Sequence, residues 1–196
     1  AVTSLRVANG KLDGADVQAV GIDPIEYPRV TSLEWNGTSS EAAFGQLASG
    51  RWLIANGIFA AQAGLVEGQA VELATPTGRR TYFVAGIGND YLNAKLSTIY
   101  VSQDLLARDF QASNDLVFLV NRAPASDPAE VGAALDDVVG DYPAFGLHST
   151  ADWRAEQAAI FDSSIVIFYA LIGALALPSL LALMNTLAIS VLARTR

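Results

Sequence analysis

Few residues in this sequence occur at a spacing that suits catalysis. The phosphate-binding pattern GxxxxGK[ST] does not occur, so we expect that the chain by itself neither binds nor hydrolyses ATP. The segment GIGND, residues 86–90, contains G-x-G but lacks the third glycine and the following helix of a dinucleotide site. His148 and Ser149 are adjacent in a predicted strand and would point to opposite faces, which makes them a poor base–nucleophile pair. The sequence therefore predicts no catalytic residue.

Residues that could bind a metal ion or a modifying group are also few. Asp13 and Asp16 could hold a cation, but two carboxylates fall short of a calcium loop, and a turn is the simpler interpretation. The chain has no cysteine and a single histidine, which excludes disulfides and thiolate metal sites and leaves little for a histidine-based one. The NGT segment at Asn36 is formally a glycosylation acceptor and equally well a turn. We expect no metal and no cofactor, and the net charge of −8 argues against a nucleic-acid partner.

The most informative feature is an uncharged run near the end of the chain. Every Asp and Glu lies at or before Asp162, and the 31 residues from Ser163 to Ala193 carry no charge. About 20 apolar residues suffice for a helix to cross the hydrocarbon core of a bilayer. The run is too long and too far from the N-terminus for a signal peptide, and a buried core helix of this length without charge is rare in soluble folds. The sequence predicts a transmembrane helix over residues 164–193.

The charges that flank this run predict its orientation. Arg194 and Arg196 follow the span with no acid beside them, whereas Asp152, Glu156 and Asp162 precede it. Cytoplasmic flanks of membrane helices are enriched in Lys and Arg. We therefore expect the two arginines to anchor a cytoplasmic end in the cell membrane and residues 1 to about 160 to lie outside.

The predicted membrane helix also carries residues suited to helix packing. Small residues let a neighbouring helix approach closely, and a polar amide is unfavourable in lipid unless it faces protein. Because a four-residue repeat drifts around a helix of 3.6 residues per turn, one straight partner cannot follow all of it. A simple anchor would need only leucine, so the pattern favours a packed helix of a multi-helix permease. The predicted packing residues are Ala170, Ala174, Pro178, Ala182, Asn185, Thr186 and Ser190.

The part before the span predicts an α+β domain. Period-two patterns and turn residues predict strands, including a hairpin at 69–87 and a buried central strand at 115–121, and helices begin after Ser, Asn and Asp residues. Strands are expected at 3–8, 16–22, 27–35, 51–55, 69–75, 81–87, 97–102, 115–121 and 144–149, with a turn at 9–14. Helices are expected at 41–49, 56–64, 102–110 and 127–143, the last with an apolar stripe of Val131, Leu135, Val138 and Val139.

A final helix is expected to start at Thr150, after Ser149 with Asp152 in a capping-box arrangement, and to run unbroken through the membrane. Such a helix could pass displacement from one side of the membrane to the other. The predicted organisation is an outer domain at 1–150, a stalk helix at 151–163, a transmembrane helix at 164–193 and the start of a cytoplasmic segment at 194–196.

The segment MNTLAISVLARTR, residues 184–196, resembles the second transmembrane helix of FtsX-like ABC transporter permeases. The family pattern of Asn-Thr, Ser-Val and Arg-x-Arg is matched here by Asn185, Thr186, Ser190, Val191, Arg194 and Arg196. Residues 17–30, 64–87 and 152–161 resemble the MacB-like extracytoplasmic core domain of the same proteins. The resemblance covers essentially the whole sequence in order. It ends where the family has a Glu and a short cytoplasmic coupling helix.

This resemblance implies a fragment of a permease subunit. In the family, a first transmembrane helix and the opening part of the outer domain come before such a segment, and further membrane helices often follow. The implied partners are an ABC ATPase subunit or domain, a second permease copy, membrane lipid, and an exported substrate or a protein of the cell envelope. The implied mechanism is mechanotransmission, in which ATP hydrolysis in the partner moves the outer domain.

Two other classes remain open from the residues alone. A single-span, membrane-anchored binding or adhesion domain would have the same outer domain and span but would end shortly after Arg196. A membrane-anchored enzyme would need paired catalytic groups, which the sequence does not show.

Overall fold

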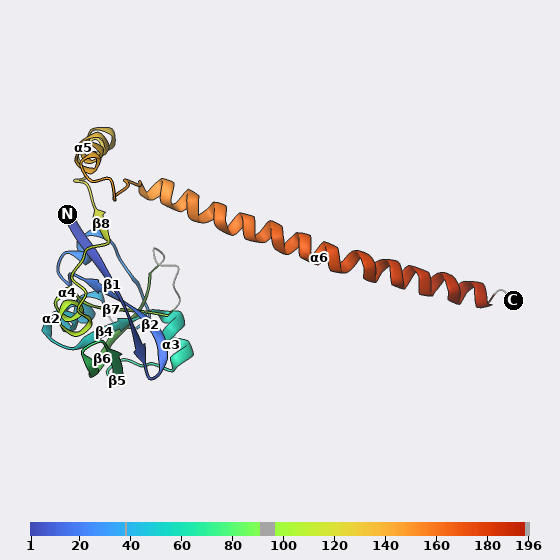
Figure 1. Cartoon of the computed structure of the whole chain (residues 1–196), viewed down its shortest axis with the longest axis horizontal. Coiled ribbons are helices and arrows are strands. Elements are labelled where there is room, and N and C mark those ends of the chain that lie inside the picture. Colours follow the sequence, from blue (N-terminus) through green and yellow to red (C-terminus); the bar gives the residue numbers. More distant parts are fainter. Residues whose placement is uncertain (38, 91–96, 195–196) are drawn as a thin grey trace. The chain divides into compact units, whose positions relative to one another are not determined.

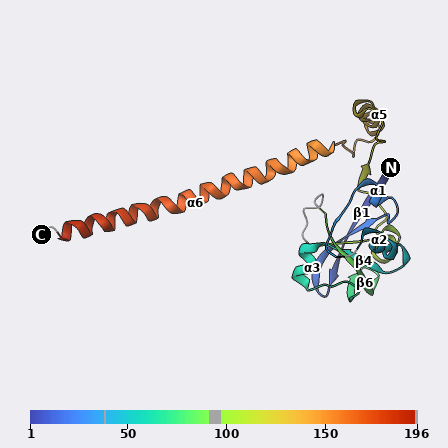
Figure 2. The ribbon, with the colours of Figure 1, turned by 180° about the vertical axis from the view of Figure 1, so that it is seen from behind.

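The computed structural model describes residues 1–37, 39–90 and 97–194; for 156–157, 160–164 and 188–194 it describes the backbone only. The protein forms two compact units, Ala1–Pro128 and Ala129–Arg196, whereas the sequence predicts one domain over residues 1–150. Figures 1 and 2 show the strands gathered in the first unit and one long helix in the second.

The strands of the first unit pair in a closed ring. The hydrogen-bonded order is β2-β7-β4-β6-β5-β1, and β1 pairs again with β2, so the ring returns to its first strand; β3 pairs with β6 and β8 with β1 (Figure 1). The strands are β1 (Val2–Leu12), β2 (Ala15–Ile22), β3 (Glu34–Trp35), β4 (Trp52–Ala55), β5 (Ala70–Thr75), β6 (Gly78–Asn89), β7 (Thr98–Ser102) and β8 (Val117–Val120).

Two apolar clusters fill the first unit. One joins alternate residues of β1, β2 and β4–β7 with residues from α3 (Gly57–Ala63) and α4 (Gln103–Phe110). The other lies under α1 (Tyr27–Val30) and α2 (Ser40–Ser49) and takes the intervening residues of β2, β4, β6 and β7. All five residues of β7 are buried because both of its faces are covered.

The helix starts in this unit follow the expected capping chemistry. The side chain of Asn56 accepts a hydrogen bond from the amide of Ile58 at the start of α3, and Gly64 ends that helix with φ 66°. The side chain of Ser102 caps α4 in the same way by accepting from the amide of Leu105. The predicted helices at 56–64 and 102–110 are therefore confirmed.

The first hairpin is tighter than the sequence predicts. The expected turn covers residues 9–14, but β1 continues to Leu12 and only Asp13 and Gly14 turn the backbone. Both have positive φ, 49° and 91°, as a two-residue turn of the primed type requires. The Asp-Gly pair was the stronger hairpin signal, and the Asn-Gly pair at positions 9 and 10 lies inside the strand.

Three predicted strands are wrong in part or in full. Residues 27–35 form the short helix α1 and the two-residue strand β3, because Pro28 fits the first turn of a helix. The strand predicted at 115–121 is β8, which among the described strands pairs with β1 alone and has an exposed pattern, so it is not a central strand. Residues 144–149 form neither helix nor strand, so the predicted strand–helix–strand unit is not completed.

The second unit consists of two helices. Helix α5 (Pro128–Gly140) is present as predicted, and none of its residues is buried. Helix α6 (Thr150–Arg194) is 45 residues long and unbroken, as the sequence predicts. Ser149 caps it: its Oγ accepts from the amide of Asp152 at 3.1 Å and donates to the Asp152 carboxylate at 2.6 Å.

Candidate functional site

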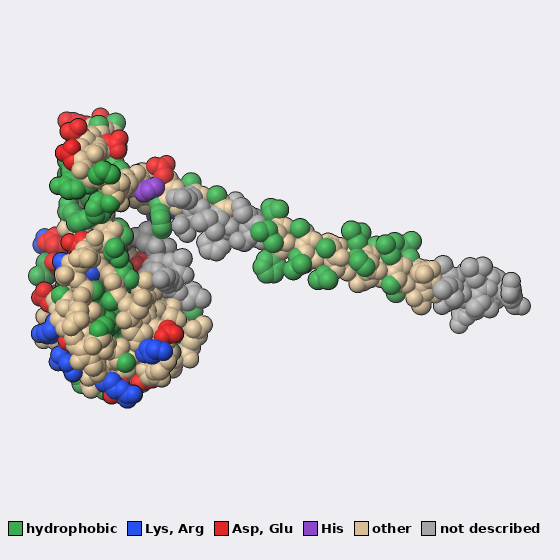
Figure 3. All heavy atoms as spheres, viewed as in Figure 1, with side chains coloured by type: hydrophobic (Ala, Val, Ile, Leu, Met, Phe, Trp, Pro, Cys, Tyr) green, Lys and Arg blue, Asp and Glu red, His purple; other side chains and the backbone are tan. Residues whose placement is uncertain are grey.

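The candidate site is the apolar part of α6. Residues Ile165–Leu187 form a 23-residue segment with a mean hydropathy of 2.4, long and apolar enough to cross a membrane. None of this segment is buried, and Figure 3 shows hydrophobic side chains along it. A helix that is apolar all round and uncovered is unusual for a protein in water, because exposed apolar surface of this extent calls for lipid or another protein.

Pro178 lies near the middle of this segment without ending the helix. Because proline has no amide hydrogen, the carbonyl of Ala174 cannot receive its ordinary helical hydrogen bond. The hydroxyl of Ser179 donates to the next carbonyl along the chain, that of Leu175, at 3.0 Å, and does not replace this bond. The helix is therefore weakened at the turn before Pro178, where two small residues, Gly173 and Ala174, would let a neighbouring helix approach closely.

The predicted packing residues share one face only in part. At 3.6 residues per turn, Ala170, Ala174, Pro178 and Ala182 fall within about 60° of Asn185 around the helix axis. Thr186 has drifted to about 100° from Asn185 by the same geometry. Its hydroxyl donates to the carbonyl of Ala182 at 2.9 Å, so this polar group has a partner within its own helix.

Three predicted residues fall outside this description. Ser190 and Arg194 belong to the backbone of α6, but their side chains lie outside the described part. Arg196 lies outside the described residues altogether. The cytoplasmic anchor formed by the two arginines therefore stays a prediction.

The first unit contains a buried ionic cluster that the sequence does not predict. Asp109 at the end of α4 is 2% exposed, and its carboxylate accepts two hydrogen bonds from Arg51, at 2.9 and 3.2 Å. The phenol of Tyr82 on β6 donates to the same carboxylate at 2.8 Å, and Thr77 donates to the Asp109 carbonyl at 2.8 Å. These residues tie the end of α4 to the start of β4 and to the β5–β6 hairpin.

The ionisation of this cluster follows from its contacts. Burial alone would raise the pKa of Asp109, but the hydrogen bonds from Arg51 and Tyr82 outweigh burial and hold that pKa below its usual value. Burial, together with the Asp109 carboxylate, raises the pKa of the Tyr82 phenol, which therefore stays protonated and able to donate. The cluster is thus charged and satisfied at neutral pH, as expected of a structural clamp.

Two further polar clusters join distant parts of the first unit. The phenols of Tyr27 and Tyr100 both donate to the carboxylate of Asp90, at 3.4 and 2.8 Å. Asp115 accepts from Arg6 at 2.7 Å and from Ser4 at 2.8 Å, which lowers the pKa of Asp115 below its usual value. Both clusters join segments that lie far apart in the sequence.

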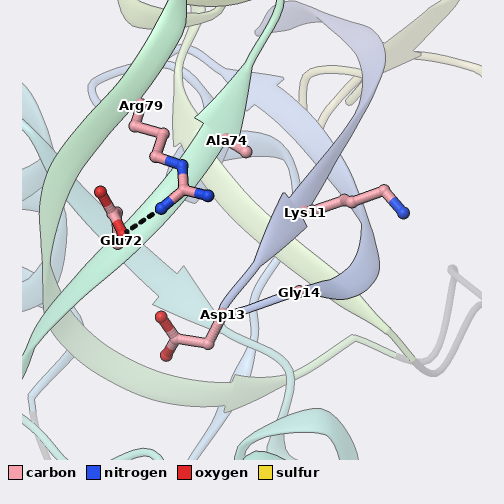
Figure 4. Close-up of a pocket in the computed structure, with 6 residues that line it drawn as sticks. All are labelled: Lys11, Asp13, Gly14, Glu72, Ala74 and Arg79. Atoms are coloured by element: carbon pink, nitrogen blue, oxygen red, sulfur yellow. Dashed lines mark hydrogen bonds and ion pairs between the residues drawn. The ribbon is translucent and has the colours of Figure 1, made fainter.

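A shallow hollow lies at the end of the β1–β2 and β5–β6 hairpins (Figure 4). Two ion pairs lie at this hollow: Arg79 pairs with Glu72 at 3.2 Å, and Lys11 pairs with Asp16 at 3.2 Å. Asp13, the other half of the candidate cation pair, lies in the hollow. In the described part of the protein, no three acidic or histidine side chains gather as metal ligands. The hollow has a volume of about 430 Å³ and is lined by Lys11, Asp13, Gly14, Glu72, Ala74 and Arg79.

Comparisons with known proteins give matches in structure only. No family model and no curated protein matches the sequence. The periplasmic region of MacB from Actinobacillus actinomycetemcomitans matches with a TM-score of 0.51 and 11% identity, over 72% of this protein and 66% of that one. The protein shares the fold of the MacB periplasmic region. The predicted MacB-like core and the α+β class followed by one long helix are therefore confirmed at the level of fold.

A second solved structure is the extracellular domain of the noncanonic ABC-type transporter YknZ from Gram-positive bacteria. It matches with a TM-score of 0.46 and 19% identity, over 71% of this protein and 75% of that domain. The sequence spans just under two-thirds of the MacB region that it matches. The similarity to the MacB region is one of fold.

Proposed function

We propose that this protein belongs to the permease subunit of an ABC transporter of the FtsX/MacB mechanotransmission type. In this proposal, the first unit lies outside the cell membrane, α6 crosses the membrane, and Arg194 and Arg196 lie on the cytoplasmic side. A partner ATPase hydrolyses ATP, and α6 transmits the resulting movement to the outer domain. The permease segment itself carries out no catalysis.

The observation that carries this proposal is the combination of a MacB-like fold with one unbroken helix that includes an apolar span. At 1.5 Å per residue, the 45 residues of α6 extend about 67 Å, of which the apolar segment takes about 35 Å. The turns from Thr150 to Ser164 add about 22 Å before the apolar segment begins. The helix continues without a break past Pro178, so displacement of one end can be passed along it to the other.

The partners proposed for the protein follow from α6. Asn185 carries an amide that needs a hydrogen-bonding partner away from lipid, and three small residues lie on the same face of the helix, Ala170, Ala174 and Ala182. A second permease copy or another helix of the transporter would satisfy both requirements. The cargo is either an exported substrate or an envelope protein on which the outer domain acts.

A cross-linking experiment in the intact transporter tests this proposal. These 196 residues contain no cysteine, so Ala158→Cys places a single cysteine in them, at an exposed stalk position; any cysteines in the rest of the transporter are first replaced by serine. We expect cross-linking between two copies to change when ATP is added, and to stay unchanged when the partner ATPase cannot hydrolyse ATP. Cross-linking that does not respond to ATP in an active transporter would favour a single-span anchor.

A further inference from the structure

Three Asn-Gly pairs occur in the first unit, and the fold holds them very differently. The pairs are Asn9–Gly10, Asn56–Gly57 and Asn36–Gly37. An Asn followed by Gly can modify itself, because glycine has no side chain to hinder attack by its backbone nitrogen on the asparagine amide. We propose that Asn36 is a site of spontaneous deamidation in the folded protein, and that the other two pairs are protected by structure.

The reaction needs only water and the two residues. The backbone nitrogen of Gly37 loses its proton to hydroxide and attacks the Cγ atom of Asn36. The bond between this carbon and the amide nitrogen Nδ2 then breaks, and the nitrogen takes up a proton from water and leaves as ammonia. The product is a five-membered succinimide. Water adds to one of its two carbonyls and opens the ring, which gives aspartate or isoaspartate.

Asn36 and Gly37 are free to bend into the ring. They lie in a bend between β3 and α2, outside every helix and strand, and both are exposed. Gly37 has φ 104°, a conformation that favours glycine. The amide of Asn36 donates to the carbonyl of Ile87 at 3.1 Å, which fixes the backbone before the pair. Within the described residues, neither the Asn36 side chain nor the Gly37 amide forms a hydrogen bond.

Asn9 and Gly10 are held in a strand ladder. They lie within β1 and face Gln18 and Val17 of β2. Gly10 is also crowded, since a Cβ placed on it would stand 2.9 Å from the ring of Phe110. Ring closure would break the ladder and move the strand against α4, so this pair reacts only after local opening.

Asn56 and Gly57 are held by a helix cap. Asn56 is 5% exposed, and its side-chain oxygen accepts from the amide of Ile58 at 3.0 Å. The amide of Asn56 itself donates to the carbonyl of Thr98 on β7 at 3.0 Å. Gly57 begins α3, so its backbone already has helical geometry. Ring closure would remove the cap and distort the helix start.

Modification at Asn36 has a local consequence. It replaces a neutral amide by a carboxylate, next to Gly37; the Oε1 atom of Glu67 lies 3.4 Å from the position that a Cβ on Gly37 would take. The isoaspartate form also adds a methylene to the backbone, three residues before Ser39, which caps α2. Both changes act near the start of the helix that covers the second apolar cluster.

Peptide mapping of the full protein in detergent tests this inference, because trypsin separates the three pairs. Cleavage after Lys and Arg places them in the peptides Val7–Lys11, Val30–Arg51 and Trp52–Arg79. The native protein is incubated at neutral and at mildly alkaline pH, and the mass gain of each peptide is followed by mass spectrometry. A parallel sample in denaturant gives the deamidation rates of the three pairs in the unfolded protein. The variant Asn36→Gln is the control that assigns the mass gain of the peptide Val30–Arg51 to Asn36.

We expect the native protein to convert Asn36 at least about tenfold faster than Asn9 or Asn56, since an opening step of about 1.4 kcal/mol already slows a reaction tenfold. The rate at Asn36 should rise with pH, and the three rates should converge in denaturant. Conversion of Asn9 or Asn56 as fast as Asn36 in the native protein would overturn the inference. So would a native Asn36 that stays intact under conditions in which the denatured protein converts it.

Discussion

Tyr82 and Asp109, which are 27 residues apart, are joined by a buried hydrogen bond of 2.8 Å from the phenol to the carboxylate. Arg51 completes the arrangement from the start of β4, through a two-pronged ion pair with the same carboxylate. Asp109 is almost completely buried, so its charge is stabilised only while these donors stay in place. The contact fixes α4 on the closed sheet.

Replacement of Asp109 by Asn should therefore destabilise the outer domain. The amide keeps the shape of the side chain but loses the charge that Arg51 and Tyr82 bind. We expect the free energy of unfolding to fall by about 1–3 kcal/mol, as for other buried polar groups that lose a partner. Denaturant unfolding measures this change, and Asp16→Asn, at a side chain that is 88% exposed, is the control. Equal stability of the Asp109 and Asp16 variants would contradict the clamp.

The same cluster predicts a dependence of stability on pH. The pKa of Asp109 is lower in the folded protein than in the unfolded protein, because the bonds from Arg51 and Tyr82 outweigh burial. The contribution of ionised Asp109 to the free energy of unfolding is complete above the ordinary pKa of aspartate, about 3.9. It is lost as the pH falls below that value and through the lower pKa that Asp109 has in the folded protein. We expect the stability of the wild type to fall more steeply than that of Asp109→Asn below about pH 4. If the free energy of unfolding falls equally with pH in the two proteins, Asp109 is not the origin of the acid sensitivity.

The helix starts at Asn56 and Ser102 and the long uncharged run could be predicted from sequence, whereas contacts between distant segments could not. A long uncharged run identifies a span by composition alone, so α6 was predictable from its first turn to its apolar segment. The Asp109 cluster was not, because Arg51, Tyr82 and Asp109 meet only after the sheet has closed. The candidate packing face is visible in the spacing of alanines, but this sequence alone does not show which partner would cover it.

Strand β8 shows why a short apolar run is ambiguous. Val117–Val120 has the composition of a strand covered on both faces, yet Phe118 is 50% exposed. Strand β7, whose Thr98 and Ser102 look more polar, is the strand that is buried on both faces. Periodicity reports the character of side chains but not whether a second layer covers them.

The apolar segment of α6 predicts that the solubility of the protein depends on detergent. A truncated protein that ends near Asp162 should be soluble without detergent, whereas the full one should require it, because Ile165–Leu187 exposes apolar side chains all round. Size-exclusion chromatography of both proteins with and without detergent measures this. A full-length protein that stays monodisperse in plain buffer would show that the segment is not a membrane span.

The protein alone should not bind ATP. The 196 residues contain no phosphate-binding loop, and the proposed function places nucleotide binding in a partner ATPase. Isothermal titration with ATP and magnesium should show no heat of binding to the full protein. Micromolar binding to this protein alone would count against the permease proposal.

In the proposed function, α6 couples the partner ATPase to the outer domain through the helix face that carries Asn185. Ala182→Leu adds bulk to this face, and Asn185→Leu removes its hydrogen-bonding group. Ala176→Leu is the matched control, because position 176 lies about 180° around the helix from Asn185. All three variants should insert into the membrane as the wild type does.

The most direct measurement is ATP-dependent cross-linking at Ala158→Cys in the intact transporter, recorded for each variant beside its insertion level and ATPase rate. We predict that Ala182→Leu and Asn185→Leu lose most of the ATP-dependent change, since an interhelical hydrogen bond of this kind contributes about 0.6–2 kcal/mol. Ala176→Leu should keep the change. An ATP-dependent change of wild-type size in both face variants would show that α6 is only a tether and does not transmit movement.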